Sequence, residues 1–458
     1  MGMFSWLSIG RLTFLLCGAA ITAPAQTFTG LASFNWTNGA NPDLVSLAQG
    51  VDGNLYGTTR YGGNSYGNGT IFRVSTTGAI TVVDILNGYR FFPFGGLVLG
   101  TGGNLYGTTS EGGPGGWGSV FEVTPAGTVQ GLTSFNSQDG AYPTGTLIQA
   151  SNGMLYGTTQ NLGPNSNSAG TVFSVAGGGT LTTLHVFDGT DGSIVYAGLV
   201  EATNGNFYGT TVQGGADGYG TVYEMTPSGT LTTLHSFDSA DGANPESALI
   251  QATDGYLYGT TTAGGANNGG TVYKITPQGA LTVLHSFDST DGAAPTAPLI
   301  QATDGNFYGT TSTGGANGDG TVFQMKSDGT IATLHSFDGT DGAQPFGGLV
   351  QATDGSFYGT TYYGGTQSHG AIYKLSMGLG PFVKAVPRFA TVGTAVTILG
   401  TDLTDATNVS FNGTKATFTV VSATEITTSV PTGATSGRIQ VTAPGGGLRT
   451  PLPFLVLP

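Results

Sequence analysis

Charged side chains are scarce in this sequence. Only 8% of the 458 residues are charged, and 12 Lys and Arg residues face 26 Asp and Glu residues, which gives a net charge of −14. Nucleic acids and anionic membrane surfaces are recognised by clustered basic side chains, whereas the basic residues here are scattered. We therefore expect no nucleic-acid partner.

Cysteine is almost absent as well. The only one, Cys17, lies in segment 1–25, which carries Arg11, an apolar stretch and a small-residue end that predict a secretory signal peptide cleaved after Ala25. The alternatives are a retained membrane anchor, although the stretch is shorter than the roughly 20 residues that span a bilayer, and a lipoprotein site, although Leu16 precedes the cysteine. The mature chain would then have no disulfide and no transmembrane segment, and we expect a secreted or cell-surface protein.

Common catalytic signatures are also missing. The sequence contains no G-x-S-x-G, no H-E-x-x-H and no phosphate-binding glycine loop followed by lysine. We therefore predict no catalytic residues and no required cofactor, and we favour a binding protein over an enzyme.

Glycine is abundant, with 81 residues, and one short motif is repeated along the chain. The letters "YGTT" recur seven times, fifty residues apart except for one interval of fifty-two, and begin at Tyr56, Tyr106, Tyr156, Tyr208, Tyr258, Tyr308 and Tyr358. Each copy holds four runs rich in β-branched and aromatic residues, which in the sixth copy are 298–302, 306–311, 320–325 and 330–337. Four strands per period of about fifty residues indicate a propeller blade.

The two ends of the repeat region predict how the blades close. Residues 27–34 match the fourth strand of a copy, whereas the last copy stops after its third strand, 370–376. The N-terminal strand can therefore complete the last blade. An open solenoid, the alternative, would need capping units. We predict a closed seven-bladed β-propeller over residues 26–377.

Tight and long connections alternate within each copy. The first and third are short turns such as the one at Asp304-Gly305, and the second and fourth are longer. Alternate connections of an antiparallel sheet emerge at the same end, so all long connections lie on one face of the ring. We call this the long-loop face.

Acidic pairs recur in the "D-x-x-D-G" segments of that face. They are Asp188 and Asp191, Asp238 and Asp241, Asp288 and Asp291, and Asp338 and Asp341. Carboxylates at this spacing can bind calcium. Asp before Gly is also a common turn signal, which we favour because of the repetition. Four histidines at one strand position, His185, His235, His285 and His335, are predicted to be hydrogen-bonded structural residues rather than metal ligands.

Aromatic residues mark the copies that differ from the others. The segment before the second copy holds Tyr89, Arg90, Phe91, Phe92 and Phe94, and nearby loops of the first, second and last copies add Trp36, Tyr61, Tyr66, Trp117, Tyr362 and Tyr363. These copies are neighbours if the ring closes. Exposed aromatic rings among polar loops are typical of sugar-binding or protein-binding surfaces. Burial of the phenylalanines under the loops or in the channel mouth is the alternative.

Residues 378–458 form a separate module of short alternating strands, typical of a small β-sandwich. On "GTAVTILGTDL", "NVSFNG", "TEITTSVP", "SGRIQVTAPGG" and "PFLV", the module resembles the immunoglobulin-like IPT/TIG domain. In secreted bacterial proteins this resemblance implies a spacer or an interaction module, without catalytic residues.

The repeats, with "DGNFYGTT", "GTVY" and "LHSFD", resemble the bacterial GloVer tandem-repeat family, whose exported members are described as choice-of-anchor proteins. That family has no assigned activity, and this chain ends at "FLVLP" without the family's hydrophobic anchoring tail. We expect a binding scaffold that recognises a polysaccharide or another surface protein through the long-loop face. The alternatives are a carbohydrate-active or lactone-hydrolysing propeller enzyme and a purely structural envelope protein. For an enzyme, the innermost strands offer a single acid, Glu201.

Overall fold

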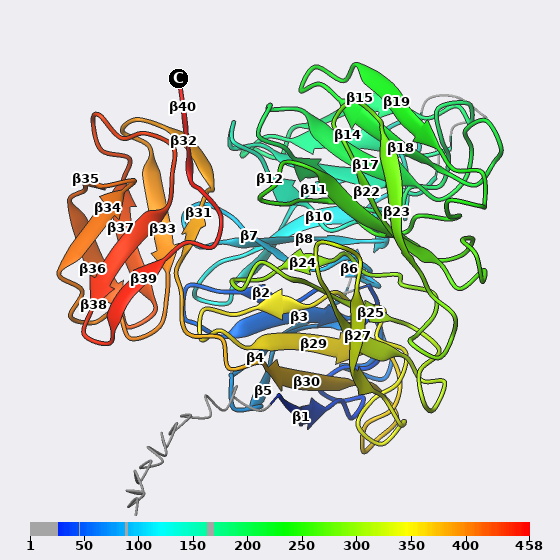
Figure 1. Ribbon diagram of the computed structural model, residues 1–458, viewed down its shortest axis with the longest axis horizontal. Helices are drawn as coiled ribbons and strands as arrows, with labels where there is room; N and C mark the ends of the chain where they lie inside the picture. Colours follow the sequence, from blue (N-terminus) through cyan, green and yellow to red (C-terminus); the bar gives the residue numbers. More distant parts are fainter. Residues whose placement is uncertain (1–25, 45, 88–89, 162, 164–168) are drawn as a thin grey trace, which may run out of the picture.

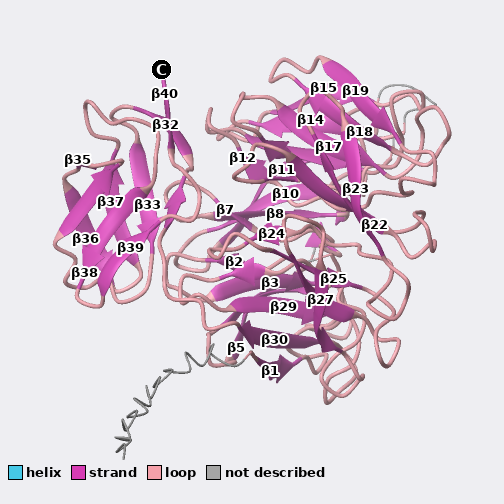
Figure 2. Cartoon of the chain, viewed as in Figure 1, coloured by secondary structure: helices cyan, strands magenta, loops and turns pink. Residues whose placement is uncertain are grey.

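The computed structural model describes residues 26–44, 46–87, 90–161, 163 and 169–458. The predicted signal peptide, residues 1–25, lies outside this part of the chain. All regular elements in the described residues are β-strands (Figure 2).

Seven four-stranded antiparallel sheets, here blades 1 to 7, follow one another around a ring (Figure 1). Blade 1 consists of β2 (Ala48–Gln49), β3 (Leu55–Thr59), β4 (Thr70–Val74) and β5 (Ile80–Ile85). Blade 2 consists of β7 (Val98–Leu99), β8 (Leu105–Thr109), β10 (Ser119–Val123) and β11 (Val129–Ser134). Blade 3 consists of β12 (Ile148–Gln149), β13 (Leu155–Thr159), β14 (Thr171–Val175) and β15 (Leu181–Val186). A short pair of strands, β6 (Arg90–Phe91) and β9 (Glu111–Gly112), lies beside blade 2.

The remaining blades repeat the same order. Blade 4 consists of β16 (Val200–Glu201), β17 (Phe207–Thr211), β18 (Thr221–Met225) and β19 (Leu231–Ser236). Blade 5 consists of β20 (Ile250–Gln251), β21 (Leu257–Thr261), β22 (Thr271–Ile275) and β23 (Leu281–Ser286). Blade 6 consists of β24 (Ile300–Gln301), β25 (Phe307–Thr311), β26 (Thr321–Met325) and β27 (Ile331–Ser336). Blade 7 consists of β28 (Val350–Gln351), β29 (Phe357–Thr361), β30 (Ala371–Ser376) and β1 (Thr27–Ser33).

The N-terminal strand β1 closes the ring. It pairs antiparallel with β30, so that Thr27 faces Ser376 and Ser33 faces Ala371 (Figure 1). The ring of Phe28 stacks on that of His335 of blade 6, with centroids 3.5 Å apart, which ties the closing strand to the neighbouring blade. The predicted seven-bladed propeller, with the N-terminal strand completing the last blade, is confirmed.

The "YGTT" phrase builds the second strand of each blade. The glycine leaves room for the aromatic ring opposite it on the third strand: a Cβ on Gly209 would lie 2.4 Å from the hydroxyl oxygen of its cross-strand partner Tyr223. The last threonine bonds to the first residue of that third strand, as in the 2.9 Å contact between the Oγ1 atoms of Thr211 and Thr221. Because these side chains are buried, the "YGTT" residues are part of the packed core of the blade.

A ring of side-chain hydrogen bonds joins the innermost strands of neighbouring blades. The Gln251 side-chain oxygen of blade 5 accepts from the backbone N–H of Thr203 of blade 4 at 2.9 Å. Six of the seven blade boundaries carry this bond, with Glu201 in place of glutamine at one of them. At the boundary of blades 1 and 2 the corresponding residue is Leu99.

Neighbouring blades also meet at their outer edges. A bulge in β15 leaves Leu184 unpaired, and its carbonyl oxygen faces the tight turn of blade 4, where a Cβ on Gly229 would lie 2.4 Å away. Gly229 has a φ of +92°, in the region that favours glycine. Glycine is therefore required there both by the backbone and by the neighbouring blade.

The C-terminal module is a β-sandwich. One sheet holds β31 (Lys384–Val386), β33 (Ala395–Leu399), β37 (Glu425–Ser429) and β36 (Phe418–Ser422). The other holds β35 (Thr414–Lys415), β34 (Asn408–Phe411), β38 (Ile439–Ala443) and β39 (Gly446–Arg449). A parallel pair, β32 (Phe389–Thr391) and β40 (Leu455–Leu457), completes it. Its own apolar core includes Ile398, Phe411 and Ile426.

The sandwich docks on the propeller face opposite the long loops. Thr424 donates its hydroxyl to the carbonyl oxygen of Val51 at 2.7 Å, and the hydroxyls of Thr353 and Thr401 lie 3.0 Å apart. Each of the two propeller residues lies two positions after the end of an innermost strand, Val51 after β2 and Thr353 after β28. Val51 stands at the boundary where Leu99 replaces glutamine, so the sandwich contacts the ring where its chain of side-chain bonds is interrupted.

A pair of glycine substitutions tests the contact between blades. Gly205 and Gly229 are both turn residues of blade 4 with positive φ, but a Cβ on Gly205 meets nothing within 4 Å. We expect Gly229→Ala to lower the free energy of unfolding by about 1–3 kcal/mol more than Gly205→Ala, because only the former collides with a neighbouring blade. Thermal or denaturant unfolding measures this difference, and equal losses would contradict the proposed packing.

Candidate functional site

A cavity of about 270 Å³ opens at the axis of the ring on the long-loop face. Its walls come from the segments that enter the innermost strands of blades 1, 3, 4, 5, 6 and 7. We call it the axial funnel. Because ring closure brings these segments together, residues from distant parts of the sequence share one cavity.

One position of the repeat forms the rim of the axial funnel. The residue three places before the leucine that enters each innermost strand is Leu44, Phe94, Thr144, Tyr196, Glu246, Thr296 or Phe346. All of these except Phe94 line the cavity. The side chains at this position include acidic, hydroxyl and aromatic types, whereas the innermost strands that follow are nearly the same in every blade. The blades therefore differ from one another chemically at the rim.

Glu246 is the acid of the rim. Burial, and secondarily the negative charge of Asp43 from blade 1, raise the pKa of Glu246 from 4.5 to about 7. The charge of Asp43, which comes from blade 1, therefore acts on a carboxyl group of blade 5. A carboxyl group with a pKa near neutrality can both donate and accept a proton near pH 7.

Asp43 is held by Arg60. Arg60 Nη1 lies 2.9 Å from Asp43 Oδ2. Its guanidinium also lies 4.0 Å from the ring centroid of Phe94, the rim residue that does not line the cavity. Burial raises the pKa of Asp43, and the Arg60 charge opposes this. The Nε atom of Arg60 is buried without a hydrogen-bond partner in the described residues.

Hydroxyl groups complete the polar part of the axial funnel. The Tyr196 hydroxyl accepts a 3.0 Å hydrogen bond from Gln160 Nε2, so the hydroxyl proton of Tyr196 can be donated to a ligand. Burial and the charge of Glu246 raise the pKa of Tyr196, which keeps that proton in place. The Thr296 hydroxyl is buried and has no protein partner among the residues described. These groups can bond to a ligand rich in hydroxyls.

Aromatic rings extend from the axial funnel across blades 7, 1 and 2. Phe346 lies 5.4 Å from Tyr362, and Tyr362 lies 4.6 Å from Tyr363. On the other side of Arg60, Tyr61 lies 5.5 Å from Phe92, which in turn lies 6.4 Å from Phe91. The structure thus brings five of the aromatic residues singled out in the sequence into two rows beside the Asp43–Arg60 pair.

The other aromatic candidates are placed differently. Trp36, Tyr66 and Tyr363 are 39%, 84% and 47% exposed. Trp36 and Tyr66 are held together by Asn64, which accepts from the indole N–H and from the backbone of Tyr66. Trp117 is half-buried and packs edge-on against Tyr142 at 6.1 Å, away from the two rows. Tyr89 lies outside the described residues, and Arg90 is placed only as part of β6.

The acidic loops and the repeated histidines bond to each other. Each histidine Nε2 lies 2.6–2.7 Å from the second aspartate of its loop, as in His335 and Asp341. The first aspartate accepts bonds from the loop itself: the hydroxyl of Thr340 holds the pKa of Asp338 below its usual range. The carboxylates are thus engaged in turns. Within the described residues no group of three or more His, Cys, Asp or Glu side chains is placed to hold a metal ion, and calcium binding stays a prediction.

Glu201, the acid that the sequence offers in the innermost strands, does not line the axial funnel. Glu201 lies at the opposite end of its innermost strand, where it accepts from the backbone N–H of Ser151 at 2.8 Å and serves the bonds between blades. The acid of the cavity is Glu246, which precedes an innermost strand rather than lying in it. Comparing the seven copies at the position three residues before that leucine would have found Glu246 and Tyr196, because the copies differ there.

The closed ring of seven four-stranded sheets defines the protein as a β-propeller. The chain belongs to the Gloeobacter/Verrucomicrobia repeat family, which matches residues 46–262 and 247–420. The resemblance of the repeats to such a family is thereby confirmed. No curated protein matches the chain.

Solved propeller structures are similar in fold. A fungal alcohol oxidase of the AA5 family in complex with copper is 13% identical, with a TM-score of 0.54, over 91% of this chain and 98% of that one. A periplasmic gluconolactonase of Pseudomonas aeruginosa is 15% identical (TM-score 0.46, 71% and 97% covered). A putative 6-phosphogluconolactonase from Bacteroides uniformis is 16% identical (TM-score 0.47, 70% and 99% covered). At these identities the likeness concerns the fold alone. No helix in the described residues is long and apolar enough to cross a membrane.

The pKa of Glu246 predicts a pH-dependent stability. Between pH 4.5 and 7 the folded protein keeps a proton that the unfolded chain releases, so this residue lowers the free energy of unfolding as the pH rises through that window. We expect Glu246→Gln to be more stable than wild type at pH 8 by about 1–3 kcal/mol and equally stable at pH 4.

Melting curves at both pH values test this expectation. Glu111→Gln, at an exposed carboxyl group on the long-loop side of blade 2, is the control and should show no such pH-dependent difference. A Glu246→Gln variant that differs from wild type equally at both pH values would contradict the assigned pKa.

Proposed function

We propose that this protein is an extracellular binding scaffold that recognises a polysaccharide at the axial funnel and the aromatic rows beside it. The observation that carries the proposal is the combination of partly exposed aromatic rings with the Asp43–Arg60 pair, Glu246 and the unpartnered Thr296 hydroxyl in one connected region.

Sugars fit this region chemically. Their ring faces are apolar and pack on flat aromatic side chains, and their hydroxyls both donate and accept hydrogen bonds. Tyr362 and Tyr363 offer faces beside the axial funnel, while Arg60 and Tyr196 offer donors and Asp43 an acceptor. A rigid ring presents these groups with little loss of entropy on binding.

The location of the protein is part of the proposal. The signal-like segment 1–25, the low charge and the absence of cysteine after Cys17 support export to the cell surface or medium. We propose that the C-terminal β-sandwich is an IPT/TIG-like module that spaces or attaches the propeller. Its docking on the face opposite the long loops supports this role, because the long-loop face is left uncovered by it.

A propeller hydrolase is the second candidate function. The raised pKa of Glu246, to which the charge of Asp43 contributes, is the observation that favours it, because a pair of carboxyl groups can supply an acid and a base. Carbohydrate or lactone hydrolysis would use this pair. A structural envelope protein, the third possibility, would make no use of the axial funnel.

Binding to a glycan array, with and without calcium, tests the proposal. We expect wild type to bind a defined set of glycans, and we expect the double variant Tyr362→Ala/Tyr363→Ala to lose at least tenfold in affinity. Trp36→Ala/Tyr66→Ala tests the outer aromatic pair in the same way. Tyr219→Ala is the matched control, because Tyr219 is 41% exposed on the loop of blade 4, away from the aromatic rows.

Chromatography of the bound glycans after incubation separates the two functions. Intact glycans support a scaffold, whereas shortened products that disappear in Glu246→Gln support the hydrolase. Equal binding by wild type and the Tyr362/Tyr363 variant, or no glycan binding by folded protein, would contradict the polysaccharide proposal and favour a protein partner or a structural role.

A further inference from the structure

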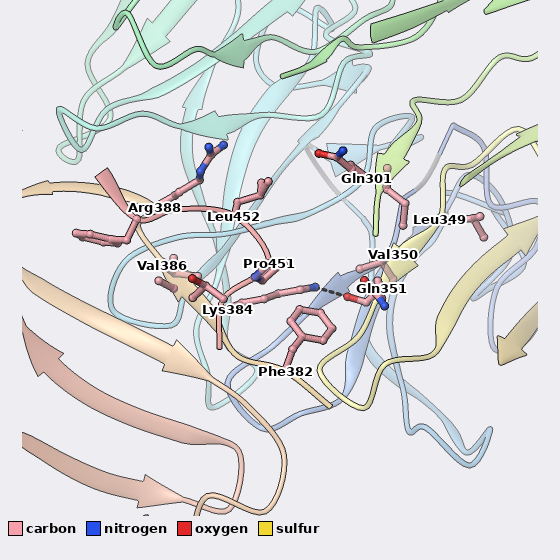
Figure 3. A pocket seen from close by; sticks show the side chains of 14 residues that line it. Gln301, Leu349, Val350, Gln351, Phe382, Lys384, Val386, Arg388, Pro451 and Leu452 are labelled. Atoms are coloured by element: carbon pink, nitrogen blue, oxygen red, sulfur yellow. Dashed lines mark hydrogen bonds between the residues drawn. The ribbon is translucent and has the colours of Figure 1, made fainter. Parts of the chain in front are cut away.

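A second cavity of about 330 Å³ lies between the propeller and the β-sandwich (Figure 3). Its propeller wall comes from the innermost strands of blades 6 and 7, at the end of the ring opposite the axial funnel. We call it the interdomain pocket. The interdomain pocket shares Ile300 and Leu349 with the axial funnel, whereas its polar residues, among them Gln351, Lys384 and Arg388, do not line the funnel.

The interdomain pocket has mainly apolar walls. Ile300, Leu349 and Val350 line it from the propeller, and Phe382, Val386 and Leu452 line it from the segment 378–458 (Figure 3). Its size is at the lower end of the range of about 300–1,000 Å³ found for ligand pockets. An apolar ligand of modest size fits such a cavity.

Two basic side chains, Lys384 and Arg388, share the walls with these apolar groups, and none of the lining residues is acidic. Lys384 Nζ donates to the carbonyl oxygen of Gln351 (Figure 3). Arg388 Nε donates to the carbonyl oxygen of Pro453 at 3.3 Å. Only 12 of the 458 residues are Lys or Arg, so two in one apolar pocket is a marked local concentration.

Neither cation has a carboxylate partner within salt-bridge distance in the described residues. Asp354 is the acid whose charge acts on Lys384. Its carboxylate already forms an ion pair with Lys374 Nζ at 3.3 Å and accepts a hydrogen bond from the Tyr358 hydroxyl at 2.8 Å. Burial lowers the pKa of Lys384 to about 8, so the amine is still mainly charged at pH 7. A half-buried cation without an anion in apolar surroundings is costly, and an anionic ligand would lower that cost.

We propose that the interdomain pocket binds a medium-chain fatty acid, with its carboxylate at Lys384 and its alkyl chain against Val350, Phe382 and Leu452. Lys384 supplies the charge complementarity, and the apolar walls take the chain. Arg388, whose guanidinium points away from the Lys384 amine (Figure 3), adds a second positive charge to the same walls. Since both domains contribute walls, the bound acid would also hold the sandwich against the ring.

Titration calorimetry of the full mature chain with decanoate tests this assignment. We expect saturable binding of decanoate, with decanol and decyltrimethylammonium at least tenfold weaker because they lack the carboxylate. Lys384→Met is expected to weaken decanoate binding at least tenfold. Lys415→Met, at an exposed lysine of the same sandwich, is the control and should bind as wild type does.

A second variant guards against a folding defect in Lys384→Met. Leu452→Trp keeps both cations and narrows the cavity, so it should also lose decanoate binding while its circular dichroism spectrum stays that of wild type. Absence of decanoate binding to the folded wild type, equal binding of decanol, or full binding by either pocket variant would overturn the proposal.

Discussion

The hydrogen bonds between β1 and β30 join the two ends of the repeat region, and the rest of the structure depends on this pairing. Each blade buries both faces of its sheet against its neighbours, so an open ring would leave two blades with an exposed apolar face. Closure by the first strand removes both edges at once. It also lets Gln49 of blade 1 accept from Thr353 of blade 7, the bond that links the first and last innermost strands.

Closure also creates the candidate site. Blade 7 becomes a neighbour of blade 1 only in the closed ring, which brings the aromatic row at Tyr362 beside the row at Arg60. In the same way Asp43 and Glu246, which lie about half the ring apart in the sequence, come close enough at the axis for one charge to shift the pKa of the other. At the other end of the axis, the sandwich covers blades 6 and 7 and forms the interdomain pocket with them.

The repeat could be predicted from the sequence because its signals are local. Alternating β-branched residues, tight Asp-Gly turns and the glycine of "YGTT" each act within one blade, and the incomplete last copy indicates how the ring closes. The site was predicted only in part. Aromatic residues such as Tyr61 and Tyr362 were found because they depart from the repeat. Glu246 departs from it too, but its raised pKa could not be predicted, because it depends on burial and on the charge of Asp43, which the folded ring brings near. The interdomain pocket was also beyond prediction, since the docking of two domains leaves no periodic pattern in either.

Amide hydrogen exchange of β1 in the mature protein tests the closed ring most directly. If β1 is the fourth strand of blade 7, the amides of Thr27–Ser33 that bond to β30 should exchange as slowly as those of β29 and β30. Fast exchange throughout β1, with β29 and β30 still protected, would show that the ring is open. It would also contradict the placing of blades 7, 1 and 2 side by side, on which the candidate site depends.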